Sequence, residues 1–135
     1  MNRWNLLGFI AAALMLLSAL AHAFAGWPTV AEGLSGTGVA TDVTAGLRIG
    51  WLWGSFCMAG FGLVTLAQSW QSRSGGGCNA ATVAAVAGTY VAFGLWAFVD
   101  RDFNPHFLLF LLTGLLCCAL LHPAARLACG ANRGQ

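Results

Sequence analysis

The sequence predicts an all-α fold: an integral membrane four-helix bundle whose antiparallel spans run up and down through the bilayer. Two observations carry this prediction. Apolar residues make up 59% of the 135 residues and charged residues only 7%, with a mean hydropathy of +0.75, whereas an ordinary soluble domain is about 25% charged. Four apolar runs, separated by polar segments, also approach the ~20 residues that a membrane-spanning helix needs. A soluble globule is therefore excluded.

The charged residues and the cysteines exclude several functional classes. Six arginines, four acidic residues and a net charge of +2 are too few and too dispersed for a nucleic-acid-binding surface. Five cysteines are an odd number, so a disulfide-stapled secreted module is not expected. The sequence also holds no glycine-rich phosphate loop, nucleophile elbow or His-Glu-x-x-His zinc motif, which are the local signatures of common enzymes. We therefore expect neither a conventional enzyme nor a nucleic-acid partner.

The first apolar run covers about residues 6–25 and is followed by Gly26, Trp27 and Pro28. At 1.5 Å per residue it can cross a hydrocarbon layer of about 30 Å. The segment Ala21-His22-Ala23 would also fit the cleavage site of a secretory signal, but the apolar run is longer than the usual signal core of roughly 7 to 15 residues. We expect a span that is retained.

The other three spans are expected at about residues 45–70, 80–99 and 105–121. The fourth has the clearest boundary, because Asn104 can cap a helix N-terminus and Pro105 suits the first helical position, where a missing N–H costs nothing. The remaining segments of this single membrane domain are an outer loop, an inner linker and an inner tail, at residues 26–44, 71–79 and 122–135.

The arginines predict the orientation of the bundle, since positive residues near short loops stay on the cytoplasmic side. With the N-terminus inside, the inner surface carries four arginines and no acidic residue: Arg3, Arg73, Arg126 and Arg133. All four acidic residues then lie outside with the other two arginines. We therefore expect both termini inside, in a multi-pass protein of the cell membrane, specifically the bacterial inner membrane.

Small residues predict which helices pack most closely, because close backbone approach replaces apolar burial as the main attraction in lipid. The second span offers Gly50-x-x-x-Gly54, and the third offers Ala84-x-x-x-Gly88-x-x-x-Ala92. We therefore expect spans two and three to form the tight central pair, with Gly88 in its interface. The long outer loop is expected to be a passive connector, and the alternative is a short interfacial helix that acts as a lid.

Most of the tryptophans and cysteines need no functional role. Indole rings anchor at the headgroup level, and four tryptophans fall near the predicted span ends: Trp4, Trp51, Trp70 and Trp96. Cys117 and Cys118 are neighbours in the fourth span, where adjacent positions of a helix point about 100° apart. We expect these thiols to face different surroundings and to behave as small hydrophobic groups.

One layer of polar residues is a candidate site. In the predicted topology every span contributes to the outer end, through His22, Arg48, Asp100, Arg101 and His106. Ionisable groups at a membrane boundary are costly unless they are paired or solvated, so one expectation is a shared cluster with an ion pair between Arg48 and Asp100. The alternative is that these side chains stay separate in the headgroup region and only set the depth of the bundle.

The cluster supports two functional hypotheses. In the first, the protein is a non-catalytic accessory subunit, or a binder of a small hydrophobic or amphipathic ligand at the outer end, without a cofactor. The helix N-terminus at His106, with Arg48 or Arg101, would then hold an anionic headgroup or carboxylate. In the second, His22 and His106 ligate a b-type haem or a transition metal in an electron-transfer or transport component. The expected partners are the lipid bilayer, a lipid or other small amphipathic ligand, and other membrane proteins.

Overall fold

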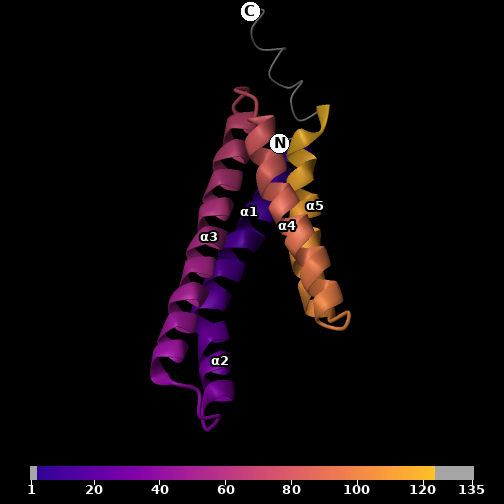
Figure 1. The fold of residues 1–135 in the computed structure, drawn as a ribbon. Coiled ribbons are helices and arrows are strands. Elements are labelled where there is room, and N and C mark those ends of the chain that lie inside the picture. Colours follow the sequence, from indigo (N-terminus) through magenta and orange to yellow (C-terminus); the bar gives the residue numbers. More distant parts are fainter. Residues whose placement is uncertain (1–2, 124–135) are drawn as a thin grey trace, which may run out of the picture.

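The computed structural model of the protein describes residues 3–123, and within this range every regular element is helical (Figure 1). Three helices are long and apolar enough to cross a membrane: Arg3–Leu34, Thr41–Arg73 and Ala80–Asp100. A fourth apolar helix, Pro105–Leu121, is shorter. The prediction of an all-α chain with four helices is confirmed.

The first helix runs well past the predicted end of span one. α1 (Arg3–Ala21), a π-helical turn (His22–Gly26) and α2 (Trp27–Leu34) follow one another without a break. Pro28 accounts for the π turn, because a proline inside a helix has no N–H to donate and its ring crowds the carbonyl four residues earlier. The wider π turn just before the proline accommodates this crowding. The expected helix end at Gly26 is therefore wrong.

The second helix, α3 (Thr41–Arg73), begins earlier than expected, so that only residues 35–40 connect it to α2. The predicted outer loop 26–44 is thus helical over most of its length. Asp42 lies in the first turn of α3, where a negative charge complements the helix dipole. Gly36 and Gly38 have φ angles of 79° and 74°, a conformation that glycine adopts without steric cost, and they allow this short connection to reverse the chain.

The last two helices begin close to where the sequence places them. α4 (Ala80–Asp100) starts after Asn79, whose side-chain oxygen accepts a hydrogen bond of 3.1 Å from the Thr82 amide. The fourth helix consists of a 3₁₀ turn (Pro105–Phe107), α5 (Leu108–Cys118) and a second 3₁₀ turn (Ala119–Leu121). The Asn104 side chain accepts a bond of 3.0 Å from the His106 amide. The predicted Asn-Pro start of this helix is confirmed.

The helices pair as two hairpins (Figure 1). α1 and α2 pack along α3, α4 packs along α5, and the hairpins meet mainly where α1 contacts α5. α3 and α4 touch each other little. The expected tight pairing of spans two and three is therefore wrong, because the small residues that α3 buries face α1 instead.

Small and polar residues at heptad spacing form the seam between α1 and α3. α3 buries five of them: Ser55, Gly62, Thr65, Ser69 and Ser72. The two helices pack antiparallel: the Ser72 hydroxyl donates to the Asn5 side-chain oxygen at 2.9 Å, and Gly8, three residues further along α1, lies against Ser69, three residues earlier on α3. A Cβ atom on Gly8 would come within 2.6 Å of the Ser69 oxygen. Small residues and inter-helix hydrogen bonds of this kind hold helices together in lipid.

Two other glycines bring α4 and α5 together. A Cβ atom on Gly94 would lie 2.6 Å from the Leu111 amide nitrogen, and one on Gly114 would lie 2.9 Å from the Ala87 carbonyl oxygen. Gly88 is exposed and has nothing within 4 Å of its Cβ position, so the stripe predicted around it does not form an interface. Cys117 is buried and Cys118 is exposed, as the 100° offset predicts.

The two ends of the bundle differ in charge. One end, here called the linker end, holds Arg3, residues 74–79 and His122, and the other, the loop end, holds residues 35–40 and 101–104. At the linker end the Trp4 ring stacks on His122 with centroids 3.9 Å apart, and Arg3 lies over Trp4 at 5.1 Å. The four acidic residues belong to the loop-end half. Arg126 and Arg133, expected at the linker end, lie outside the described residues.

The loop end is splayed open. α3 has 33 residues and α4 has 21, which at 1.5 Å per residue makes α3 roughly 18 Å longer. α2 and the first turns of α3 therefore extend past the tip of the second hairpin (Figure 1). The hairpins converge at the linker end and diverge toward the loop end, and this divergence positions the candidate site.

Candidate functional site

Trp51 of α3 holds the π turn of the first helix. Its indole Nε1 donates a hydrogen bond of 2.6 Å to the carbonyl oxygen of His22. Its ring stacks on the His22 imidazole with centroids 4.0 Å apart and an interplanar angle of 4°. A Cβ atom on Gly26 would lie 2.7 Å from Trp51 Cζ2, so the glycine makes room for the indole. Irregular π turns in helices are frequent at functional sites.

A chain of hydrogen bonds orients the His22 ring. The Ser55 hydroxyl donates to the Trp51 carbonyl oxygen at 3.3 Å, and the Ser55 hydroxyl oxygen lies 2.9 Å from His22 Nδ1. In the tautomer that matches this bond, the neutral imidazole carries its proton on Nδ1 and Ser55 accepts from Nδ1–H. Nε2 of His22 is then a hydrogen-bond acceptor.

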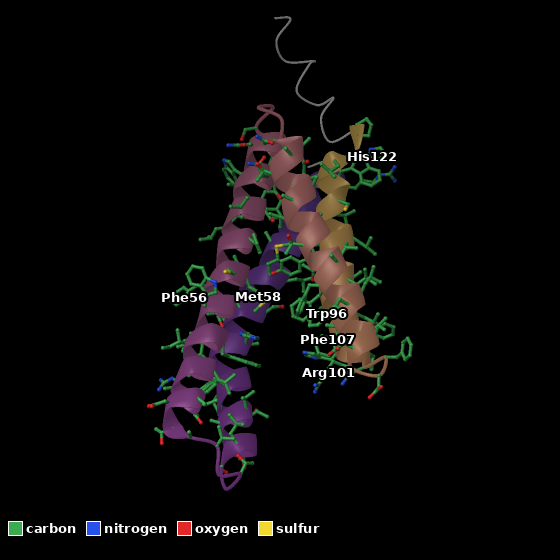
Figure 2. The ribbon with its side chains drawn as sticks, in the orientation of Figure 1. Phe56, Met58, Trp96, Arg101, Phe107 and His122 are labelled. Atoms are coloured by element: carbon green, nitrogen blue, oxygen red, sulfur yellow. The ribbon has the colours of Figure 1, made fainter. Side chains whose placement is uncertain are left out.

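His22 borders a groove of about 200 Å³ between the two hairpins. The lining residues come from the π turn, α3, α4 and α5: His22, Gly54, Met58, Phe61, Thr89, Tyr90, Phe93 and Phe110. Figure 2 shows Met58 on the side of α3 that faces the second hairpin and Phe56 on the opposite side. None of the lining residues is an acid, an arginine or a lysine. The groove is thus an apolar site with one imidazole at its edge.

Aromatic rings form a connected wall of this groove. Phe61 meets Tyr90 edge to face at 6.1 Å, Tyr90 lies 6.0 Å from Phe110, and Phe110 meets Phe93 edge to face at 5.1 Å. These separations are in the range in which aromatic pairs attract one another. The Tyr90 side chain is only 4% exposed, and its hydroxyl has no hydrogen-bond partner within the part of the chain that the structure describes.

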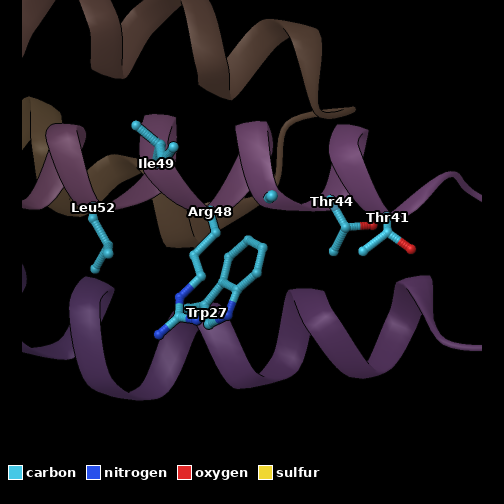
Figure 3. A pocket seen from close by; sticks show the side chains of 7 residues that line it. Trp27, Thr41, Thr44, Arg48, Ile49 and Leu52 are labelled. Carbon is cyan, nitrogen blue, oxygen red and sulfur yellow. The ribbon is translucent and has the colours of Figure 1, made fainter.

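The structure distributes the five predicted site residues over three places. His22 lines the groove between the hairpins. Arg48 is exposed and lies beside Trp27 in a shallow depression between α2 and α3 (Figure 3). Asp100, Arg101 and His106 are exposed at the tip of the second hairpin, where Figure 2 labels Arg101. The expected cluster at one layer does not form, because the hairpins diverge where these side chains lie.

The expected ion pair is also not formed. Arg48 belongs to α3 and Asp100 to the end of α4, and these helices make few contacts. Both side chains are exposed, and no ion pair joins them among residues 3–123. This is the arrangement of the alternative hypothesis, in which the charged groups remain separate.

Sequence reasoning missed most of the groove. Trp51 was expected as an interfacial anchor, but it is half-buried against His22. Ser55 could have been found, because it begins the heptad series of small and polar residues that continues through Gly62 and Ser69. The aromatic residues of α4 and α5 carry no comparable signal, since apolar side chains in a span are equally suited to lipid and to a groove.

The two histidines proposed as haem or metal ligands are not brought to one site. His22 lines the groove between the hairpins, whereas His106 is exposed at the tip of the second hairpin and does not line it. Within residues 3–123, no group of three or more His, Cys, Asp or Glu side chains is placed to hold a metal ion.

The fold and the groove define a small helical protein with membrane-length helices and an apolar site between two hairpins. No protein-family model matches this chain, and neither a curated protein nor a solved structure matches it.

Proposed function

We propose that this protein is a non-catalytic membrane protein that binds a small hydrophobic or amphipathic ligand in the groove between its two hairpins. The observation that carries the proposal is the aromatic wall with the oriented imidazole of His22 beside it. Small-molecule sites are concave and mostly apolar, and they contain a few polar groups that fix the orientation of the ligand. The groove has each of these properties.

We further propose that the helices span the cell membrane, the inner membrane of a bacterium, with both termini in the cytoplasm. Arg3 and Arg73 lie near the linker end, and Arg126 and Arg133 follow the last helix in the sequence, whereas the loop-end half holds two arginines, Arg48 and Arg101. This charge distribution supports a cytoplasmic linker end by the positive-inside rule. The hairpins diverge toward the loop end (Figure 1), so the ligand would bind at the outer side of the bundle.

The alternative of haem or metal ligation by His22 and His106 has less support. Axial ligation needs both imidazoles on opposite faces of one macrocycle, and only His22 lines the groove. His22 Nδ1 is also engaged with Ser55. We therefore propose a site without a cofactor, and the absorption spectrum of the purified protein tests this directly: a Soret band would overturn it.

Gly54 offers a direct test of the proposed site. It lines the groove, and a Cβ atom on it would meet only His22 Cε1, at an ordinary contact distance of 3.6 Å. Gly54→Leu should therefore fill the groove without disturbing helix packing. Gly50→Leu is the matched control, because Gly50 lies one turn earlier on α3 and has nothing within 4 Å of its Cβ position.

The measurement is equilibrium dialysis of naphthalene against protein in detergent micelles, with protein-free micelles as the reference. We expect the wild type and Gly50→Leu to bind naphthalene equally, and Gly54→Leu to bind about tenfold more weakly, which corresponds to about 1.4 kcal/mol. Equal binding by Gly54→Leu and the wild type would show that the groove is not the ligand site.

A further inference from the structure

We infer that the groove binds an uncharged molecule of one or two fused rings that carries a hydroxyl group, and that this hydroxyl donates a hydrogen bond to Nε2 of His22. The inference rests on the proposed function and specifies the chemical class of its ligand. It follows from three properties of the groove: its volume, its lining and the protonation of its only imidazole.

The volume limits the ligand to a small molecule. A cavity of about 150 Å³ lined by apolar side chains binds benzene, and the groove measures about 200 Å³. It is smaller than the ~300–1,000 Å³ of sites that hold drug-sized ligands. One ring, or two fused rings, therefore fill it, whereas a larger polycyclic molecule would extend out of it.

The lining selects an uncharged ring system. Phe61, Phe93 and Phe110 present aromatic faces and edges, and Met58 adds a thioether that adapts to a flat surface. Because none of the lining residues carries a formal charge when His22 is neutral, an ionic ligand would lose its hydration without a counter-charge, which costs several kcal/mol.

The imidazole selects a hydrogen-bond donor. Trp51 stacks on the His22 ring and the Ser55 hydroxyl lies 2.9 Å from its Nδ1, so the ring is held in place. With the proton on Nδ1, the remaining nitrogen of the ring is an acceptor. An acceptor that an apolar ligand covers loses its bond to water, and the loss costs free energy unless the ligand supplies a donor. A hydroxyl on the ring supplies this donor without adding a charge.

Three probes separate the ring from the hydroxyl: naphthalene, 2-naphthol and 2-methoxynaphthalene, in which a methyl ether replaces the hydroxyl and cannot donate. We expect wild-type protein to bind 2-naphthol about tenfold more tightly than 2-methoxynaphthalene. A tenfold difference in affinity corresponds to about 1.4 kcal/mol, which is the net contribution of one hydrogen bond. His22→Phe keeps an aromatic ring against Trp51 but removes the acceptor. In this variant the tenfold preference for 2-naphthol over 2-methoxynaphthalene should disappear, whatever the change in its affinity for naphthalene.

A spectroscopic measurement covers the case in which His22→Phe does not fold. In wild-type protein labelled with ¹⁵N-histidine, 2-naphthol should shift the Nε2 resonance of His22, and 2-methoxynaphthalene should not. Ser55→Ala removes the acceptor of Nδ1–H while keeping the imidazole, so this variant should show a smaller preference for 2-naphthol.

The outcomes distinguish this inference from the proposed function. If naphthalene binds and Gly54→Leu weakens its binding about tenfold, but 2-naphthol has no advantage, the groove is a ligand site without hydroxyl recognition, as for a lipid acyl chain. This result would overturn the inference and leave the proposed function standing. A preference for 2-naphthol that persists in His22→Phe would also overturn the inference. If no probe binds, both are wrong.

Discussion

The indole of Trp51 lies parallel to the imidazole of His22 and donates to the His22 carbonyl oxygen at 2.6 Å. One side chain of α3 thus holds both the ring and the backbone of a residue in the π turn of the first helix. The Ser55 hydroxyl, one turn further along α3, lies 2.9 Å from Nδ1 of the same imidazole. Two residues on adjacent turns of one helix therefore determine the orientation of His22.

Trp51→Phe should lower the free energy of unfolding by about 1 kcal/mol, because phenylalanine keeps the stacked ring but leaves the His22 carbonyl without the indole donor. Trp51→Ala should cost about 3 to 5 kcal/mol through the additional loss of packing. The control is Trp53→Phe, since Trp53 is 69% exposed and should change stability by less than about 0.5 kcal/mol. Denaturant titration in detergent measures all three. Equal effects of Trp51→Phe and Trp53→Phe would contradict the role of the indole bond.

Gly94→Leu should destabilise the protein far more than Gly88→Leu. The added side chain at Gly94 would overlap the backbone of Leu111, whereas Gly88 faces open space. We expect a loss of about 3 kcal/mol for Gly94→Leu and less than about 0.5 kcal/mol for Gly88→Leu. Thermal aggregation midpoints in one detergent compare the two variants, and a larger effect at Gly88 would mean that the α4 stripe is an interface after all.

Tyr90→Phe should stabilise the empty protein. The Tyr90 hydroxyl is buried without a partner among the described residues, and an unsatisfied buried group costs about 1 to 3 kcal/mol. Removing it while keeping the ring should raise the free energy of unfolding by about 1 kcal/mol. The test is thermal unfolding of protein freed of bound small molecules, with Tyr90→Leu as the control that also removes the ring. A loss of stability in Tyr90→Phe would mean that the hydroxyl is hydrogen-bonded in solution.

Asn5 and Ser72 should be energetically coupled across the linker end of the seam. Both are buried, and the Ser72 hydroxyl donates to the Asn5 side-chain oxygen at 2.9 Å. In a double-mutant cycle of Asn5→Ala and Ser72→Ala we expect a coupling of about 1 kcal/mol, as for one buried hydrogen bond between helices. A coupling energy indistinguishable from zero would mean that this hydrogen bond does not stabilise the contact between α1 and α3, which would then depend on side-chain packing alone.

Reporter fusions after Arg73 and at the C-terminus should read as cytoplasmic, and a fusion after Leu34 should read as external. The reason is that four of the six arginines, Arg3, Arg73, Arg126 and Arg133, belong to the predicted inner segments, which the positive-inside rule places in the cytoplasm. The fusion after Leu34 is the internal control, since it lies in the connection at the opposite end of the first hairpin. A cytoplasmic signal there would reverse the topology and move the groove to the inner side.

The sequence by itself determined the class of fold and the position of the helices in the second half. The apolar composition of a segment can be read without knowing which other helix packs against it. The side chains of Asn79 and Asn104 cap their helices through hydrogen bonds to residues two or three positions further along the chain. The same local reasoning failed at Pro28, because whether a proline ends a helix or only widens one turn depends on what supports that turn. Here the support is Trp51, from the next helix.

Only the tertiary structure decided which helices pair and where the candidate site lies. A stripe of small residues shows that another helix can approach closely, but it does not show which helix does so. The stripe around Gly88 is exposed, whereas Gly94 and Gly114 make the contact between α4 and α5. The groove likewise depends on the angle between the two hairpins, which separates His106 of the second hairpin from His22 of the first. That angle results from long-range contacts, chiefly of α1 with α5, and no local pattern encodes them.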